Sequence, residues 1–265
     1  MRRRALIELL KARYPQRDAK ELFAEVLRGR VQVAGRTVMK PGTPVPLDAP
    51  LTVLDAPRYV SRGGEKLAAA LDTWSIDCAG TTWIDGGCST GGFTDCLLQR
   101  GASLVYAVDV GKNQLAPRIR SDSRVRAMEG TNIMSLTAGG LDPRPEWAVA
   151  DLSFRSLRRA AAHLLSLTAG HRGIFLVKPQ FEYRDPPPDF SGVVREARAV
   201  RDILSDLIGD LGVEGVAVNR AMASPIRGRK GNREFLLLLE TRPGAAAPGR
   251  PDPALLDALL AEGGA

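Results

Sequence analysis

Cysteine is scarce in this sequence, and its pattern narrows the class of protein. The 265 residues include only Cys78, Cys88 and Cys96. Three cysteines cannot all pair with one another, and no two of them have the C-x-x-C spacing. We therefore expect no disulfide framework, no structural zinc and no other metal site. Unpaired thiols suit the reducing environment of the cytoplasm.

Long apolar runs are also absent. No stretch reaches the roughly 18 apolar residues that a membrane helix needs. Met1–Arg4 opens the chain with the basic character of a signal peptide, but Glu8 and Lys11 interrupt the apolar stretch that follows, and no small-residue cleavage site comes after it. We therefore expect a cytoplasmic protein without an export signal or a membrane partner.

The positive charge is unevenly distributed. The net charge is +7, and residues 1–60 hold 12 Lys and Arg against 6 Asp and Glu, so the remaining 205 residues are close to neutral. This asymmetry favours a module that faces nucleic acid, attached to a larger neutral domain. The alternative is an ordinary basic surface that only keeps the protein soluble. With 44% hydrophobic and 25% charged residues, the chain is not wholly disordered.

Residues 1–60 have the pattern of a small α+β domain. A short helix begins near Leu6 and ends before Pro15, and Asp18 is placed to cap a second helix that runs to Leu27. Alternating valines around Ala34-Gly35 predict a hairpin, and residues 51–54 predict a further strand. We expect this domain to bind RNA through its basic side chains. These are Arg2, Arg3, Arg4, Arg17, Lys20, Arg28 and Arg30.

Residues 61–241 alternate between strands and helices. The expected strands cover residues 81–85, 104–109, 125–128, 147–151, 173–178, 213–218 and 234–240; the expected helices cover residues 66–74, 93–99, 156–167 and 195–208. Such alternation predicts an α/β domain with a Rossmann-like, mostly parallel sheet covered on both faces. Its last strand should be antiparallel. The Pro/Gly/Ala-rich segment 242–265 should be a mobile tail, with one short helix over 254–261.

A Gly-rich turn, Asp85–Gly92, lies between the first strand of this sheet and the helix after it. An open α/β sheet binds nucleotide-like ligands at this place. The turn does not match G-x-G-x-x-G, and no G-K-[ST] follows, so two phosphate-binding motifs are excluded. Asp109 ends the second strand, where a carboxylate can hold a ribose diol. The combination fits S-adenosylmethionine better than a dinucleotide, although a plain tight turn would also use glycines.

Five separated motifs resemble the TlyA/hemolysin A family of FtsJ-like ribosomal RNA 2′-O-methyltransferases. They are Ser61–Leu67 (SRGGEKL), Asp85–Asp95 (DGGCSTGGFTD), Ala150–Phe154 (ADLSF), Val177–Glu182 (VKPQFE), and Ser224–Gly228 (SPIRG) with Gly231–Leu236 (GNREFL). The resemblance covers about residues 17 to 240. It implies methylation of a cytidine ribose in ribosomal RNA of the small subunit, the large subunit or both, with S-adenosylmethionine as cofactor.

The resemblance also assigns roles to particular residues. The family's catalytic tetrad falls on Lys66, Asp151, Lys178 and Glu234. Cofactor contacts fall on Asp85, Gly87, Ser89, Thr90, Gly91, Gly92, Phe93, Asp109, Thr131, Asn132 and Asp151. Further RNA contacts are expected at Arg62, Arg227, Arg229 and Lys230.

The four catalytic candidates are also placed sensibly by the predicted topology. Asp151 and Lys178 each close a strand at the carboxyl edge of the sheet, where ligands bind. Glu234 opens the antiparallel last strand and so begins at the same edge. A ribose hydroxyl is a poor nucleophile, and a base that takes its proton lowers the barrier to methyl transfer. Taken singly, Lys66 and Glu234 could be ordinary solvated charges, and Asp151 could be a helix cap.

Several other functions compete with this interpretation. Asp185-Pro186-Pro187-Pro188 imitates an amino-methyltransferase motif, but it follows the wrong strand and lacks the aromatic residue. A 5-methylcytosine enzyme needs a nucleophilic cysteine beside the acceptor, whereas Cys88 lies in the cofactor turn. Two further alternatives are a non-catalytic RNA-binding protein with a decayed methyltransferase fold and a membrane-active hemolysin. The sequence also departs from the family, with Gly86 in place of a β-branched residue and Ala34 in place of asparagine before Gly35.

Overall fold

The chain forms two compact units, which divide after Pro57. The computed structural model describes residues 2–152, 156–241, 256–257 and 259–260. The division falls three residues before the boundary expected from the sequence. Within the described part of the chain, no helix combines the length and the apolar character that crossing a membrane requires.

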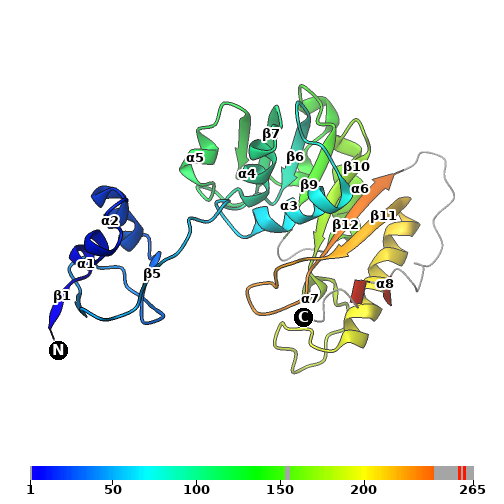
Figure 1. The fold of residues 1–265 in the computed structure, drawn as a ribbon. Coiled ribbons are helices and arrows are strands. Elements are labelled where there is room, and N and C mark those ends of the chain that lie inside the picture. Colours follow the sequence, from blue (N-terminus) through cyan, green and yellow to red (C-terminus); the bar gives the residue numbers. More distant parts are fainter. Residues whose placement is uncertain (1, 153–155, 242–255, 258, 261–265) are drawn as a thin grey trace. The chain divides into compact units, whose positions relative to one another are not determined.

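The N-terminal unit contains two helices and five short strands (Figure 1). Helices α1 (Leu6–Arg13) and α2 (Ala19–Leu27) share a core of leucines and valines with β2 (Val31–Val33) and β5 (Leu51–Val53). The Asp18 carboxylate accepts a hydrogen bond from the Lys20 amide at 2.6 Å, as expected of an N-cap.

The strands of this unit form two small sheets. A three-stranded antiparallel sheet has the order β3 (Arg36–Thr37), β2, β5. Two strands that the sequence did not predict, β1 (Arg3–Ala5) and β4 (Pro44–Pro46), form an antiparallel pair. Each is only three residues long and β4 has a proline at both ends, so neither carries a clear alternating pattern.

The second unit is built on a seven-stranded mixed sheet, with helices on both faces (Figure 1). The strand order is β11-β12-β10-β9-β6-β7-β8. The strands are β6 (Thr82–Gly86), β7 (Leu104–Asp109), β8 (Val125–Glu129), β9 (Trp147–Ala150), β10 (Arg172–Val177), β11 (Val216–Ala223) and β12 (Phe235–Thr241). Strands β6 to β10 are mutually parallel, and β12 runs antiparallel between β10 and β11. This confirms the predicted Rossmann-like sheet with an antiparallel last strand.

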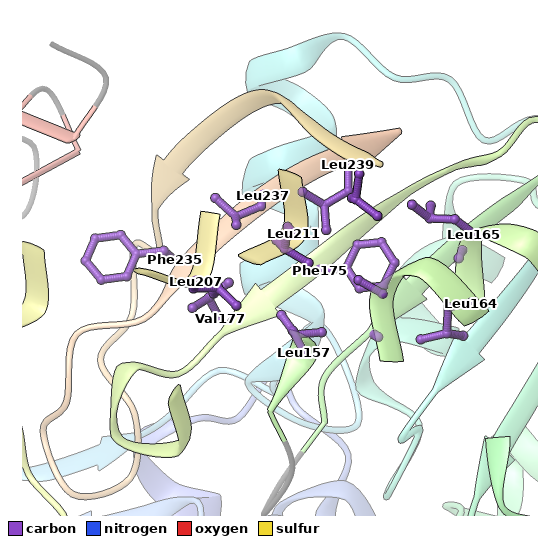
Figure 2. Close-up of a cluster of buried hydrophobic side chains, with 14 of the residues drawn as sticks. Leu157, Leu164, Leu165, Phe175, Val177, Leu207, Leu211, Phe235, Leu237 and Leu239 are labelled. Atoms are coloured by element: carbon purple, nitrogen blue, oxygen red, sulfur yellow. The ribbon is translucent and has the colours of Figure 1, made fainter. Parts of the chain in front are cut away.

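The helices of this unit bury the two faces of the sheet in two hydrophobic clusters. They are α3 (Gly63–Trp74), α4 (Gly92–Gln99), α5 (Pro117–Arg120), α6 (Leu157–Leu167), α7 (Pro179–Glu182) and α8 (Ala197–Val213). One cluster joins α3 and α4 to Trp83 and its neighbours; the other joins α6 and α8 to Ile84 and Phe175. Figure 2 shows the second cluster, with Leu157, Phe175 and Leu237 among its labelled members. Successive side chains of a strand point to opposite sides of the sheet. A strand that is apolar throughout therefore contributes apolar side chains to both faces.

The boundary between α8 and β11 differs from the sequence-based expectation. Residues 213–218 were expected to be a strand, but α8 continues to Val213 and β11 begins at Val216. Leu207 and Leu211 extend the buried face of the helix by one more turn, and Gly215 then reverses the chain with φ of 76°. The apolar run alone could not separate the end of the helix from the start of the strand.

Part of the predicted mobile tail packs against the second unit. Leu256 and Leu259 are buried in the cluster that contains α8, and the Arg233 guanidinium donates hydrogen bonds to the carbonyl oxygens of Leu259 and Leu260 at 3.1 and 3.0 Å. The short apolar pattern expected over 254–261 therefore has an apolar surface to cover, and the mobility of the segment stays a prediction. The other residues of segment 242–265 lie outside the described part of the chain.

Candidate active site

An open groove runs along the edge of the sheet where the parallel strands end. Its cavity volume is about 1530 Å³, and its lining comes from the Gly-rich turn, from the ends of β7, β9 and β10, and from the start of β12. Register explains how distant motifs meet there. Gly86 pairs with Ala150, so Gly87 and Asp151 follow paired residues; Val177 pairs with Phe235, so Lys178 and Glu234 flank a second pair.

The Gly-rich turn needs glycine where it approaches its neighbour. Gly87 has φ of 78°, and a Cβ atom there would lie 2.8 Å from the carbonyl oxygen of Asp151. Ser89 also has a left-handed backbone, and its amide donates to Asp109 Oδ2 at 2.8 Å. The other oxygen of Asp109 accepts from the Gly111 amide at 2.7 Å. The carboxylate of Asp109 is therefore fixed beside the turn.

Asp85 is a fully buried carboxyl group in the lining of the groove. Its Oδ2 accepts hydrogen bonds from the Thr94 amide at 3.0 Å and from the Thr94 hydroxyl at 2.6 Å, whereas Oδ1 has no hydrogen-bond partner among the described residues. Burial raises the pKa of Asp85 to about 7, opposed by the bonds from Thr94 and reinforced by the nearby charges of Asp151 and Asp109.

These features fit S-adenosylmethionine. A buried carboxyl oxygen without a partner can receive a donor from a ligand, a second carboxylate stands at the end of β7, and the backbone of the turn is open where side chains would block it. Ser89, Thr90, Gly92 and Phe93 line the same half of the groove, together with Thr131 and Asn132 after β8. Gly91 does not line the groove. A Cβ atom at Gly91 would contact Leu115 and Ile119 of the α5 region.

The four catalytic candidates form two ion pairs, and all four line the groove. Lys178 Nζ lies 2.5 Å from Asp151 Oδ1. Lys66 on α3 pairs with Glu234, and both side chains are more than nine-tenths buried. A buried pair without excellent geometry costs more in desolvation than it returns in attraction. The Lys66–Glu234 pair is therefore weak evidence for a stabilising role.

Local structure explains why Lys178 and Glu234 are held at this edge. Pro179 begins α7 directly after Lys178, so the chain turns as soon as β10 ends. Ahead of β12, the Gly228 amide donates to the carbonyl oxygen of Asn232 at 2.9 Å and closes a tight loop. A Cβ atom at Gly228 would overlap the carboxylate of Glu234, so a larger residue at this position would displace the end of the Glu234 side chain.

The predicted RNA-binding residues fall into three groups. In the second unit, Arg62, Arg229 and Lys230 line the groove, whereas Arg227 lies outside its lining. In the N-terminal unit, most of the predicted residues are exposed. Arg30 differs, because its guanidinium forms a largely buried ion pair with Glu25. Its geometry is that of a structural residue.

The structure also identifies groove residues that the sequence-based assignment missed. Asn232 is buried in the lining, and Arg159 of α6 is exposed at its rim. Asn232 stands inside the GNREFL motif, so a signal for it was present. Nothing in the sequence pointed to Arg159.

The cysteines do not provide a nucleophile. Burial raises the pKa of the Cys78 thiol to about 12 and raises the pKa of the Cys88 and Cys96 thiols as well. A thiol reacts as its thiolate, so all three are held in the unreactive form. No group of three or more potential metal ligands occurs among the described residues.

The fold and the groove together define a Rossmann-like methyltransferase that uses S-adenosylmethionine. Residues 59–241 match the protein family described as FtsJ-like methyltransferase. The chain is 39% identical over 249 residues to the 16S/23S rRNA (cytidine-2′-O)-methyltransferase TlyA of Mycobacterium tuberculosis, covering 91% of this chain and 92% of that protein. It is 37% identical over 216 residues to Hemolysin A of Brachyspira hyodysenteriae, covering 80% of this chain and 89% of that protein.

The solved structures agree with this assignment. A Streptococcus thermophilus protein described as a hemolysin superposes with a TM-score of 0.73 at 34% identity, covering 98% of this chain and 95% of that one. The chain belongs to the TlyA/hemolysin A family of FtsJ-like methyltransferases.

Proposed function

We propose that this protein transfers a methyl group from S-adenosylmethionine to the 2′-oxygen of a cytidine ribose in ribosomal RNA, within ribosomal subunits in the cytoplasm. The observation that carries the proposal is the pair of lysine–carboxylate contacts, Lys178–Asp151 and Lys66–Glu234, in one groove. The Mycobacterium tuberculosis relative is named for this activity on 16S and 23S RNA.

The proposed cofactor contacts lie on the β6–β7–β8 side of the groove. Asp85, the backbone of Gly87 and Ser89, and Asp109 would hold S-adenosylmethionine. When bound, it supplies a methyl group on a positively charged sulfur, which is open to attack by an oxygen nucleophile.

Lys178 is the proposed base. Its Nζ accepts the proton of the ribose 2′-hydroxyl as the new carbon–oxygen bond forms and the sulfur–methyl bond breaks. Asp151, 2.5 Å from Nζ, orients the lysine. Lys66 brings a second positive charge to the groove, and Glu234 keeps that lysine in position.

Product chemistry tests the proposal. The full-length protein is incubated with methyl-labelled S-adenosylmethionine and with small and large ribosomal subunits from cells that lack this gene. The RNA is then digested with alkali. Because alkaline cleavage needs a free 2′-hydroxyl, we expect the label in a resistant dinucleotide that begins with cytidine. Label recovered in mononucleotides, on the base, would overturn the proposed acceptor.

A non-catalytic RNA-binding protein is the competing function, and the same experiment addresses it. Such a protein would bind ribosomal RNA and transfer no label to either subunit. The Lys178→Ala variant is the matched control, because it removes the proposed base and leaves the residues proposed to hold the cofactor unchanged.

A further inference from the structure

The groove has two chemically different halves. The half over β6, β7 and β8 carries the carboxyl groups of Asp85 and Asp109. Elsewhere the lining includes three exposed cations, namely Arg159 near the start of α6, and Arg229 and Lys230 on the loop before β12. We call these three residues the basic wall. Positive charge gathers here although residues 61–265 as a whole are nearly neutral.

The cations on the loop are not used to stabilise the fold. Arg229 and Lys230 form no hydrogen bond or ion pair with any described residue, in contrast to the deeper Arg158, which bonds both Glu182 and Asp210. Two adjacent cations with open hydrogen-bond donors at a groove rim are suited to an anionic ligand.

The loop with these cations is tied to a second loop by one buried side chain. Asn232 is 3% exposed; its Oδ1 accepts from the Val194 amide at 2.9 Å, and its Nδ2 donates to the Gly192 carbonyl oxygen at 2.9 Å. Gly192 itself lies beside Lys230, since a Cβ atom there would be 3.6 Å from Nζ. Asn232 therefore joins the segment around Gly192 to the loop before β12.

We propose that the basic wall binds the phosphates that flank the acceptor nucleotide, and that Asn232 is the positioning residue that keeps its two loop cations in place. This inference rests on the proposed function. Arg229 and Lys230 line the same groove as Lys178, beside which the acceptor ribose must lie, and they precede Glu234 by five and four residues in the chain. A strand that enters there brings one negative charge per nucleotide past the wall.

Neutralising the two loop cations tests the wall. The double variant Arg229→Gln/Lys230→Gln is compared with Arg198→Gln/Arg201→Gln, which removes the same charge from α8 outside the groove. We expect the KM for ribosomal subunits to rise about tenfold in the wall variant only. Loss of two phosphate contacts should also make the association constant for ribosomal RNA less dependent on salt. We expect the magnitude of the negative slope of log K against log salt to decrease by about 1.4. An equal effect of both double variants would overturn the proposal.

The role of Asn232 is tested by two substitutions. Asn232→Asp keeps an acceptor for the Val194 amide and loses the donor to Gly192; Asn232→Ala loses both. We expect both variants to raise the KM for ribosomal subunits, with the larger rise in Asn232→Ala, while the Kd for S-adenosylmethionine stays within about twofold. Thermal unfolding checks that each variant is folded. A fall in kcat with an unchanged KM in the folded Asn232→Asp variant would contradict the positioning role.

Failure of the proposed function would be distinguishable from failure of this inference. If the unmodified protein transferred no methyl group to either subunit, the function would fail. The salt dependence of RNA binding by the two double variants would still decide whether the wall contacts phosphates.

Discussion

Lys178 illustrates how one residue acquires its place from several local causes. It follows a buried apolar strand, precedes the proline that starts α7, and lies 2.5 Å from Asp151. The aromatic ring of Phe181 is 5.9 Å from its Nζ. A lysine whose only role is to be solvated at the surface would not need a carboxylate, a proline and an aromatic ring around it.

We expect Lys178→Ala to lower kcat by about 10²–10⁴-fold, because it removes the proposed general base. Lys178→Arg should be equally impaired, since a guanidinium does not give up its proton at accessible pH. Methyl transfer to ribosomal subunits at saturating RNA measures the loss, and calorimetry with S-adenosylmethionine serves as the control for an intact cofactor site. Normal turnover by the arginine variant would exclude Lys178 as the base.

Asp85, which lines the cofactor half of the groove, makes the stability of the protein depend on pH. Because burial raises its pKa to about 7, the folded protein keeps a proton on this residue at pH values where the unfolded chain has lost it. The contribution of Asp85 to stability therefore falls as pH rises from about 4 to about 7, by at most about 1.4 kcal/mol per pH unit, and levels off above about pH 8.

The Asp85→Asn variant lacks this titration. We expect its free energy of unfolding to improve relative to that of the unmodified protein between pH 5 and pH 7, with a constant difference above about pH 8. Urea unfolding of both proteins at each pH measures the difference. Parallel pH profiles would show that the buried carboxyl does not titrate in this range.

Among the elements, the hairpin of the N-terminal unit has an alanine at a position with left-handed backbone conformation. Val33 pairs with Arg36, so Ala34 and Gly35 form a two-residue turn, with φ of 47° and 76°. Left-handed backbone is costly for alanine and tolerated by asparagine, which is favoured in this kind of turn. The alanine at position 34 is therefore a source of strain in the hairpin.

Ala34→Asn should stabilise the N-terminal unit by about 0.5–1 kcal/mol, because asparagine tolerates the left-handed conformation better than alanine does. The side chain at position 34 is exposed, so the substitution changes no packing. Ala34→Val is the matched opposite, and should lower stability because a β-branched residue is disfavoured at positive φ. Thermal unfolding monitors both variants, and an equal melting temperature for the two would contradict the argument.

At the scale of the whole molecule, charge and chemistry are divided between the two units. The groove and all four catalytic candidates belong to the second unit, and most of the net positive charge lies in the first sixty residues. The basic wall adds a local exception within the second unit. RNA affinity and methyl transfer should therefore be partly separable.

Removal of residues 1–57 should weaken binding to ribosomal RNA and reduce its salt dependence, because fewer phosphate contacts release fewer counterions. The second unit has its own hydrophobic clusters, and circular dichroism checks that it remains folded. Binding is measured across a series of salt concentrations. An unchanged slope would assign the RNA contacts to the groove rim alone.

The sequence by itself determined the alternation of strands and helices along the chain, the position of the Gly-rich turn and the family. These features are local or periodic: buried strands are continuous apolar runs, and turns need glycine where the backbone is left-handed. The motifs that carry Lys66, Asp151, Lys178 and Glu234 are short and contiguous, so they could be recognised before any contact was known.

Only the tertiary structure decided which of these residues meet. Lys66 and Glu234 are 168 positions apart, and their ion pair follows from the placement of α3 against the edge of the sheet. The tie between Asn232 and Gly192, the burial of Leu256 and Leu259, and the pairing of β1 with β4 are of the same kind. Each depends on a partner far away in the chain, and such a contact leaves no periodic trace in the sequence around either residue.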